Sequence, residues 1–237
     1  MAFGDNIRPV SPLGPSFGGE NSLQYYFDQW EGVGTINAIN DQLPYSIFRP
    51  NENVVETTFK LEVTAAYPGG DMFGIYAAGN PATKLTVLDG NEPVGTPFAI
   101  TFNYQGVAGR VASVNLNDLT DLHVLNGFGP SILGFWFYTP DQGGQNFYSE
   151  DFRNPGGMAQ MLVYNSVVDY GDWYLCWEDL QRSLNAPGNL HSDSDFQDIV
   201  IKAESMTPTV PEPATMLLLG SGLIGLAGYG RKKFLKK

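Results

Sequence analysis

The chain has 237 residues, which is enough to bury a sizeable core in one globular domain. Gly (28) and Pro (16) are frequent and only 16% of residues are charged, a composition typical of short strands joined by turns. The net charge is −12, and residues 1–209 carry −16, because the last 28 residues hold five basic residues against Glu212 alone. Such an acidic surface repels nucleic acid and attracts divalent cations.

The N-terminal residues 1–20 are rich in Gly, Pro and Ser, which predicts an extended arm. Met1–Asp5 lacks the basic and apolar regions of a secretory signal, so we expect that a signal peptide has been removed or missed. Asn21, with Gln24 three residues later, is a candidate helix cap. Apolar residues then recur at helical spacing until Gly32, and this predicts one short globular helix.

From residue 59 onward the hydrophobic period changes to two, which is the period of a strand with one buried face. Short runs of this kind, bounded by Gly, Pro, Asn or Asp, occupy 59–64, 73–76, 85–88, 98–102, 132–138, 161–164 and 199–201. We therefore predict a mainly β domain over 21–205, an antiparallel β-sandwich of jelly-roll type. Asp89-Gly90 indicates a hairpin after the strand at 85–88, and 141–145 has turn chemistry.

The aromatic run at 134–138 allows two interpretations. Large rings usually fill the core of a sandwich, and this is the simpler interpretation. An exposed face carrying Trp136 and Tyr138 would instead stack on sugar rings, which defines an alternative function as a carbohydrate-binding module.

Five carboxylates bracket a short Gly/Pro/Asn-containing loop near the end of the domain. They are Glu178, Asp179, Asp193, Asp195 and Asp198. If the flanking segments pair as strands, these oxygens converge and could bind calcium, which takes six to eight oxygen ligands. Asp residues that merely cap turns would give the same pattern.

Catalysis is not expected. Asp169 and Asp172 with Glu178 and Asp179 offer paired carboxylates of the kind that glycosidases use, but the sequence does not give their separation. His123 and His191 lie in different regions, and no Gly-x-Ser-x-Gly or phosphate-loop motif is present. Cys176 is the single cysteine, so no internal disulfide forms, and a buried, inert thiol is expected.

The C-terminal segment has three parts in order. Residues 206–213 form a linker that ends in Val210-Pro211-Glu212-Pro213, whose prolines keep the tetrapeptide extended. The apolar stretch 214–230 would span about 25 Å as a transmembrane helix. Residues 231–237 form a basic tail that should stay cytoplasmic and leave the domain outside.

This three-part segment resembles the PEP-CTERM sorting signal, found on exported proteins of Gram-negative bacteria that make exopolysaccharide. The resemblance implies recognition by a membrane-embedded exosortase that is thought to cut near Pro-Glu-Pro. It implies passage through the inner membrane, then a place on the cell surface or in the extracellular matrix.

The acidic segment is similar to the Glu-Asp…Asp-x-Asp-Tyr-Asn-Asp signature of domains of the DUF4114 type, over roughly 40–205. The resemblance implies a β-rich surface domain with calcium at the five carboxylates. Phe196 and Gln197 depart from the signature, so Gln197 is left out of the predicted site. We thus expect a calcium-stabilised, non-catalytic surface or matrix protein. Two alternatives are a module that binds exopolysaccharide and a self-assembling filament or layer subunit whose 1–20 arm adds a strand to a neighbour.

Overall fold

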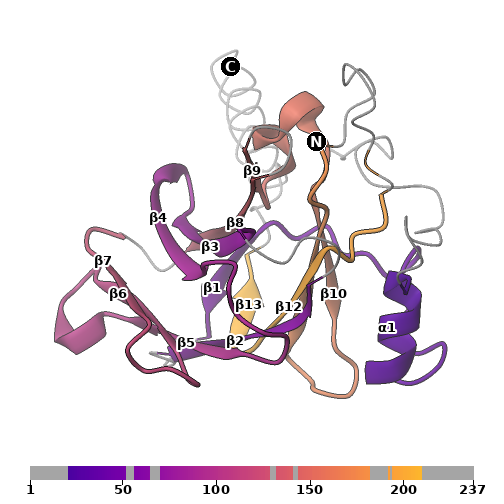
Figure 1. The fold of residues 1–237 in the computed structure, drawn as a ribbon, viewed down its shortest axis with the longest axis horizontal. Coiled ribbons are helices and arrows are strands. Elements are labelled where there is room, and N and C mark those ends of the chain that lie inside the picture. Colours follow the sequence, from indigo (N-terminus) through magenta and orange to yellow (C-terminus); the bar gives the residue numbers. More distant parts are fainter. Residues whose placement is uncertain are drawn as a thin grey trace, which may run out of the picture. The chain divides into compact units, whose positions relative to one another are not determined.

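The fold is taken from a computed structural model, which describes residues 21–51, 56–64, 70–128, 132–140, 144–181, 192 and 194–209. These residues all belong to one compact unit that spans Gly4–Thr209. Within it, strands form two antiparallel sheets with one α-helix beside them (Figure 1).

The six-stranded sheet has the order β13-β1-β8-β3-β4, with β9 also paired to β8. Its strands are β1 (Ile47–Pro50), β3 (Met72–Ala77), β4 (Asn80–Leu88), β8 (Leu133–Thr139), β9 (Gln145–Tyr148) and β13 (Met206–Pro208). Gly134 on β8 leaves room for the Tyr76 ring of β3, because a Cβ built there would lie 2.3 Å from the ring carbon Cζ. β3 and β8 are buried along nearly their whole length, on both faces of the sheet.

The seven-stranded sheet has the order β10-β11-β12-β2-β5-β6-β7. Its strands are β2 (Glu56–Thr64), β5 (Pro97–Phe102), β6 (Val111–Asn115), β7 (Leu122–Leu125), β10 (Met161–Asn165), β11 (Trp173–Trp177) and β12 (Ile199–Ala203). Short 3₁₀ turns occupy Tyr104–Gly106, Asp151–Arg153 and Pro155–Gly157. Every pairing in both sheets is antiparallel.

One hydrophobic core lies between the two sheets. Phe59 of the seven-stranded sheet meets Phe73 and Phe135 of the six-stranded sheet, each with ring centroids 5.9 Å apart. Phe73 also packs edge-on against Trp177. Aromatic pairs of this geometry contribute about 0.5–1.5 kcal/mol each beyond their area burial. The prediction of a mainly β, two-sheet antiparallel fold is confirmed, whereas the jelly-roll order stays a prediction.

The helix α1 (Leu23–Trp30) packs on the outer face of β10, β11 and β12. Its buried residues Leu23 and Phe27 join a second hydrophobic cluster with Tyr164, Tyr174 and others from those strands. The predicted helix is confirmed, but its cap is Ser22 and not Asn21, since the Ser22 hydroxyl accepts from the Tyr25 amide at 3.2 Å. The outer face of half the sheet is thereby covered.

Two local predictions differ from the structure. Asp89-Gly90 does not close a hairpin between neighbouring strands, because β4 and the next strand, β5, lie in different sheets. The predicted linker 206–213 begins inside the fold, because β13 pairs with β1 and the Thr209 amide donates to the Ile47 carbonyl at 2.9 Å. The ordered domain therefore continues to the residue before Val210.

No helix within the described ranges is long and apolar enough to cross a membrane. The predicted arm 1–20, the motif Val210-Pro211-Glu212-Pro213, the transmembrane stretch 214–230 and the basic tail 231–237 all lie outside the described residues. These predictions stand on the sequence.

Candidate metal centre

The acidic cluster forms at one end of the β11–β12 pair. Trp177, the last residue of β11, pairs with Ile199, the first residue of β12. Glu178 and Asp179 therefore leave β11 beside Asp198, which enters β12. One carboxylate oxygen from each of the three lies within 4.8 Å of the others, and all three side chains are buried. The predicted strand pairing thus brings together residues that are about 20 positions apart.

Backbone and amide groups hold this cluster in place. The Asp179 amide donates to Asp198 Oδ2 at 2.8 Å, and the Leu180 amide donates to Glu178 Oε1 at 3.3 Å. The buried Gln160 side chain donates to the carbonyl oxygens of Glu178 and Leu180. Nothing in the sequence around Gln160 indicated that role, because the contact spans 18 to 20 residues.

Asp195 adds a fourth carboxylate to the neighbourhood of Asp198. Its side chain is 2% exposed, and its Oδ2 accepts from Gln197 Nε2 at 3.0 Å. Ser194 and Phe196 have φ of 61° and 55°, so the chain turns in the left-handed region on both sides of Asp195. Gln197, omitted from the predicted site, is fully buried against Asp195. Asp193 lies outside the described residues.

The electrostatics of the cluster disfavour a full set of bare carboxylates. Burial raises the pKa of Asp198 well above its usual range, and the negative charges of Glu178, Asp179 and Asp195 raise that pKa further. Carboxylates a few ångströms apart in a buried site cannot all stay ionised unless a cation lies between them. Without a cation, at least one of them takes up a proton. Carboxylate oxygens are hard ligands, so the donor set fits calcium better than zinc or copper.

Other predicted site residues lie elsewhere. Trp136 is 3% exposed, its indole N–H donates to the Leu85 carbonyl, and Lys84 Nζ lies 4.2 Å from its ring centroid. No ring face is left for a sugar, so Trp136 belongs to the core interpretation, which corrects the stacking prediction for this residue. Tyr138 is half-buried.

The carboxylates considered for catalysis do not form one site. Asp169 and Asp172 lie at the opposite end of β11 from Glu178, and both form ion pairs with Lys202. Glu178 follows Asp172 by six residue steps of extended chain, which corresponds to about 20 Å. Glycosidase carboxyl groups are about 5–9.5 Å apart. His123 pairs with Asp121 at 3.1 Å, and His191 lies outside the described residues.

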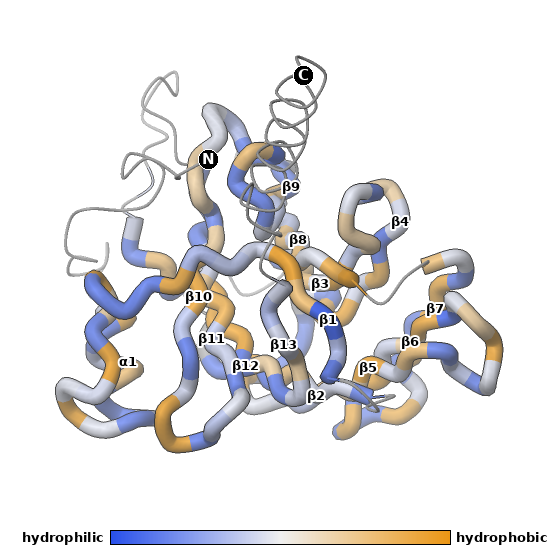
Figure 2. The backbone as a smooth tube through the Cα atoms, turned by 180° about the vertical axis from the view of Figure 1, so that it is seen from behind, coloured by the Kyte–Doolittle hydropathy of each residue, from blue (hydrophilic) through white to orange (hydrophobic). Residues whose placement is uncertain are grey.

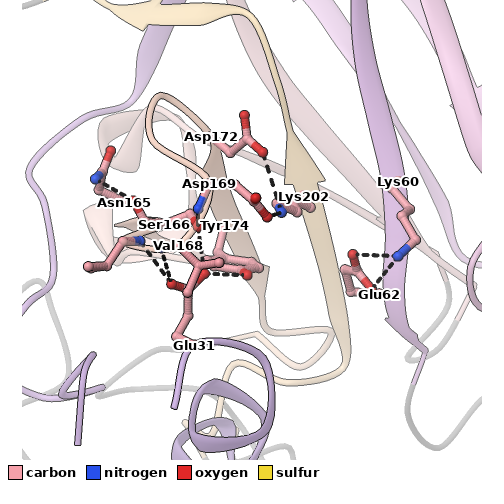
Figure 3. A network of polar contacts seen from close by, with 11 residues as sticks. Glu31, Lys60, Glu62, Asn165, Ser166, Val168, Asp169, Asp172, Tyr174 and Lys202 are labelled. Atoms are coloured by element: carbon pink, nitrogen blue, oxygen red, sulfur yellow. Dashed lines mark hydrogen bonds and ion pairs between the residues drawn. The ribbon is translucent and has the colours of Figure 1, made fainter.

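Another buried acidic residue, Glu31, was not found from the sequence. It follows α1 and is 6% exposed. Figure 3 shows its carboxylate facing Ser166, Val168 and Tyr174. Its Oε1 accepts from the hydroxyls of Ser166 (2.5 Å) and Tyr174 (2.7 Å), and its Oε2 accepts from the amides of Val167 (2.9 Å) and Val168 (2.8 Å). Burial acts to raise the pKa of Glu31, but these four hydrogen bonds outweigh burial and hold the pKa below its usual value. Glu31 therefore fastens α1 to the β10–β11 turn.

Comparison with known proteins identifies one segment of the chain. The family described as the PEP-CTERM protein-sorting motif matches residues 209–232. No curated protein and no solved structure matches the chain. The likeness of the acidic segment to DUF4114 domains gains no support from these comparisons and stays a prediction. The sorting motif begins where the described β domain ends, and it supports exosortase-dependent sorting of an exported protein with transient anchoring at the membrane.

Proposed function

We propose that this exported protein serves at the cell surface or in the extracellular matrix of a Gram-negative bacterium as a non-catalytic, calcium-stabilised component. The observation that carries the calcium proposal is the convergence of Glu178, Asp179 and Asp198, whose carboxylate oxygens lie within 4.8 Å of one another in a buried site. Asp195 supplies a further carboxylate beside them.

Calcium binding is favoured here because burying charge costs free energy. An isolated ionised carboxylate in a low-dielectric site is strongly unfavourable, and several together are worse. A bound divalent cation would reverse the sign of that interaction and turn mutual repulsion into shared attraction. Calcium, which accepts carboxylates, backbone carbonyls and water in flexible geometry, suits a cluster that mixes side chains with the loop between β11 and β12.

A non-catalytic role is supported by the way the acidic side chains are distributed. Within the described ranges, the clustered carboxylates are buried, and the acidic pair at the other end of β11 forms ion pairs with Lys202. The two groups lie about 20 Å apart along β11, too far to supply the acid and the base of one glycosidase site. The carbohydrate-binding alternative lacks its predicted stacking ring, because Trp136 is buried.

The test is thermal unfolding of the full chain in a nonionic detergent, with calcium and then with a chelator. Calcium at one hundred times its dissociation constant would stabilise the folded state by about 2.7 kcal/mol. For a domain of this size that corresponds to about 5–11 °C in Tm.

Two variants give the experiment its specificity. Asp195→Asn should remove most of the calcium-dependent shift, whereas Asp118→Asn should retain it, since Asp118 is exposed on the β6–β7 turn. A Tm that is the same with calcium and with chelator would contradict the proposal. An equal shift in both variants would place the calcium elsewhere and contradict the assignment of the site.

A further inference from the structure

We infer that strand β7 is a pairing edge at which two copies of this chain join their seven-stranded sheets. This inference goes beyond the proposed function and does not depend on calcium. It starts from the position of β7, which is the last strand of the order β10-β11-β12-β2-β5-β6-β7 (Figure 1). An end strand presents backbone N–H and C=O groups on its outer side, where another strand can pair.

The other edge strands within the described residues carry protection that β7 lacks. The protecting features are Pro81 and Lys84 on β4, Pro208 on β13, the Asn154 side chain bound to the Tyr148 backbone on β9, and the Leu43 amide bound to Val163 on β10. Proline, lysine and covering groups are the usual means of blocking edge-to-edge association. The sequence of β7 is Leu-His-Val-Leu, with no proline and no lysine.

The ladder between β6 and β7 shows which residues of β7 point outward. The Asn115 amide donates to the Asp121 carbonyl at 3.1 Å, so this is a hydrogen-bonded pair. Such pairs alternate along an antiparallel ladder, which makes Ser113–His123 the next one. The backbone groups of Leu122 and Val124 therefore point away from β6, toward the open edge.

Leu122 and Val124 also carry exposed apolar side chains, 43% and 38% exposed. Leu116 and Leu119 on the same hairpin are exposed as well, and hydrophobic residues recur along β5, β6 and β7 in Figure 2. α1 covers the outer face at β10, β11 and β12, at the other end of the sheet. The open edge thus combines hydrogen-bonding groups with apolar surface.

The partner that fits this edge is a second copy in antiparallel register about a twofold axis beside His123. In this register Leu122 of one copy pairs with Val124 of the other, so both outward residues of each strand are used. Asp121 of one copy then lies opposite Leu125 of the other, so the two β7 strands overlap along their whole length. The same two outward residues are used on both copies, as a self-complementary twofold interface requires.

This register makes a specific prediction for cross-linking. The two His123 residues would form a non-hydrogen-bonded pair with Cα atoms about 4.5 Å apart, which is within the range that a disulfide bridges. Full-length His123→Cys chain in nonionic detergent, with calcium present, should form a disulfide-linked dimer of twice 25.9 kDa on mild oxidation. The native Cys176 is buried and should not contribute.

The control is Val33→Cys, which places a more accessible thiol after α1, at a residue 86% exposed. It should give no more dimer than wild type. Adding Val124→Lys to the His123→Cys chain should abolish the cross-link, because a charge then occupies the shared edge. Circular dichroism of each variant checks that the sheets are formed.

A second measurement keeps the inference open to refutation if His123→Cys fails to fold. Sedimentation of the wild-type chain over a dilution series should show a monomer–dimer equilibrium, and Val124→Lys should remain monomeric throughout. Cross-linking of His123→Cys no greater than that of Val33→Cys would overturn the inference. Wild-type sedimentation that matches Val124→Lys at every concentration would overturn it as well.

Discussion

Truncation of the Glu31 side chain gives the sharpest stability prediction, because one carboxylate there accepts four hydrogen bonds. In Glu31→Ala the hydroxyls of Ser166 and Tyr174, both buried, lose their acceptor. A buried donor without an acceptor costs about 1–3 kcal/mol. The amides of Val167 and Val168 belong to exposed residues and can bond to water, so they add less.

The expected loss is therefore about 3 kcal/mol in the free energy of unfolding, or about 6–12 °C in Tm for a domain of this size. Glu31→Gln should lose only about 1 kcal/mol, because the amide oxygen can accept from the two backbone amides while the hydroxyls turn to accept from its NH₂ group. The contrast between these variants separates the loss of acceptors from the loss of charge.

Urea and thermal unfolding of the full chain in detergent measure both variants. Tryptophan fluorescence follows the unfolding, and Trp30 contributes to the signal because its ring stacks on Tyr174 with centroids 5.3 Å apart. Glu56→Ala is the control, because Glu56 is exposed and its removal should change stability by less than about 0.5 kcal/mol. If Glu31→Ala matched this control, the carboxylate would not be what fastens the helix.

Three further outcomes follow from the structure. The pKa of Glu31 is held below its ordinary value of about 4.3. The stability that the ionised carboxylate contributes should therefore be complete above that pH and be lost as the pH falls through the pKa of the folded state. Glu31→Gln should remove this step from a series of Tm values measured against pH. Gly134→Ala should destabilise by about 1–3 kcal/mol in urea unfolding, because its Cβ would enter the Tyr76 ring, and an unchanged midpoint would refute that packing. The Cys176 thiol is fully buried, and burial raises its pKa, so it should react with a thiol reagent only after denaturation; rapid reaction of the native chain would contradict its position.

The sequence predicted those elements whose signal is local. The strands that contain 59–64, 73–76, 98–102 and 161–164 follow from hydrophobic runs between turn residues, and all are present. β7 and β9 were missed because each has four residues and a mixed pattern, too short for a period-two signal. β13 was missed because residues 206–213 were assigned to the linker that carries the Pro-Glu-Pro motif, although proline is tolerated at the edge of a sheet.

The acidic site was predictable in part for the same reason. Glu178, Asp179, Asp195 and Asp198 flank one loop, and the pairing of β11 with β12 brings those carboxylates together. Gln160 and Glu31 were not predictable, because their contacts join segments 18 to 143 residues apart and no local pattern encodes such a contact. The burial of Trp136 was not predictable either, because it results from tertiary packing: Lys84 and the Leu85 carbonyl cover its ring.

Calorimetric titration of the full chain with calcium tests the central claim most directly. Saturable binding of one ion per chain is expected, absent in Asp198→Asn, whose carboxylate lies within 4.8 Å of those of Glu178 and Asp179, and retained in Asp118→Asn. A wild-type chain that shows no saturable calcium binding, or an Asp198→Asn chain that binds as tightly as wild type, would contradict the account of the buried carboxylates as a calcium site.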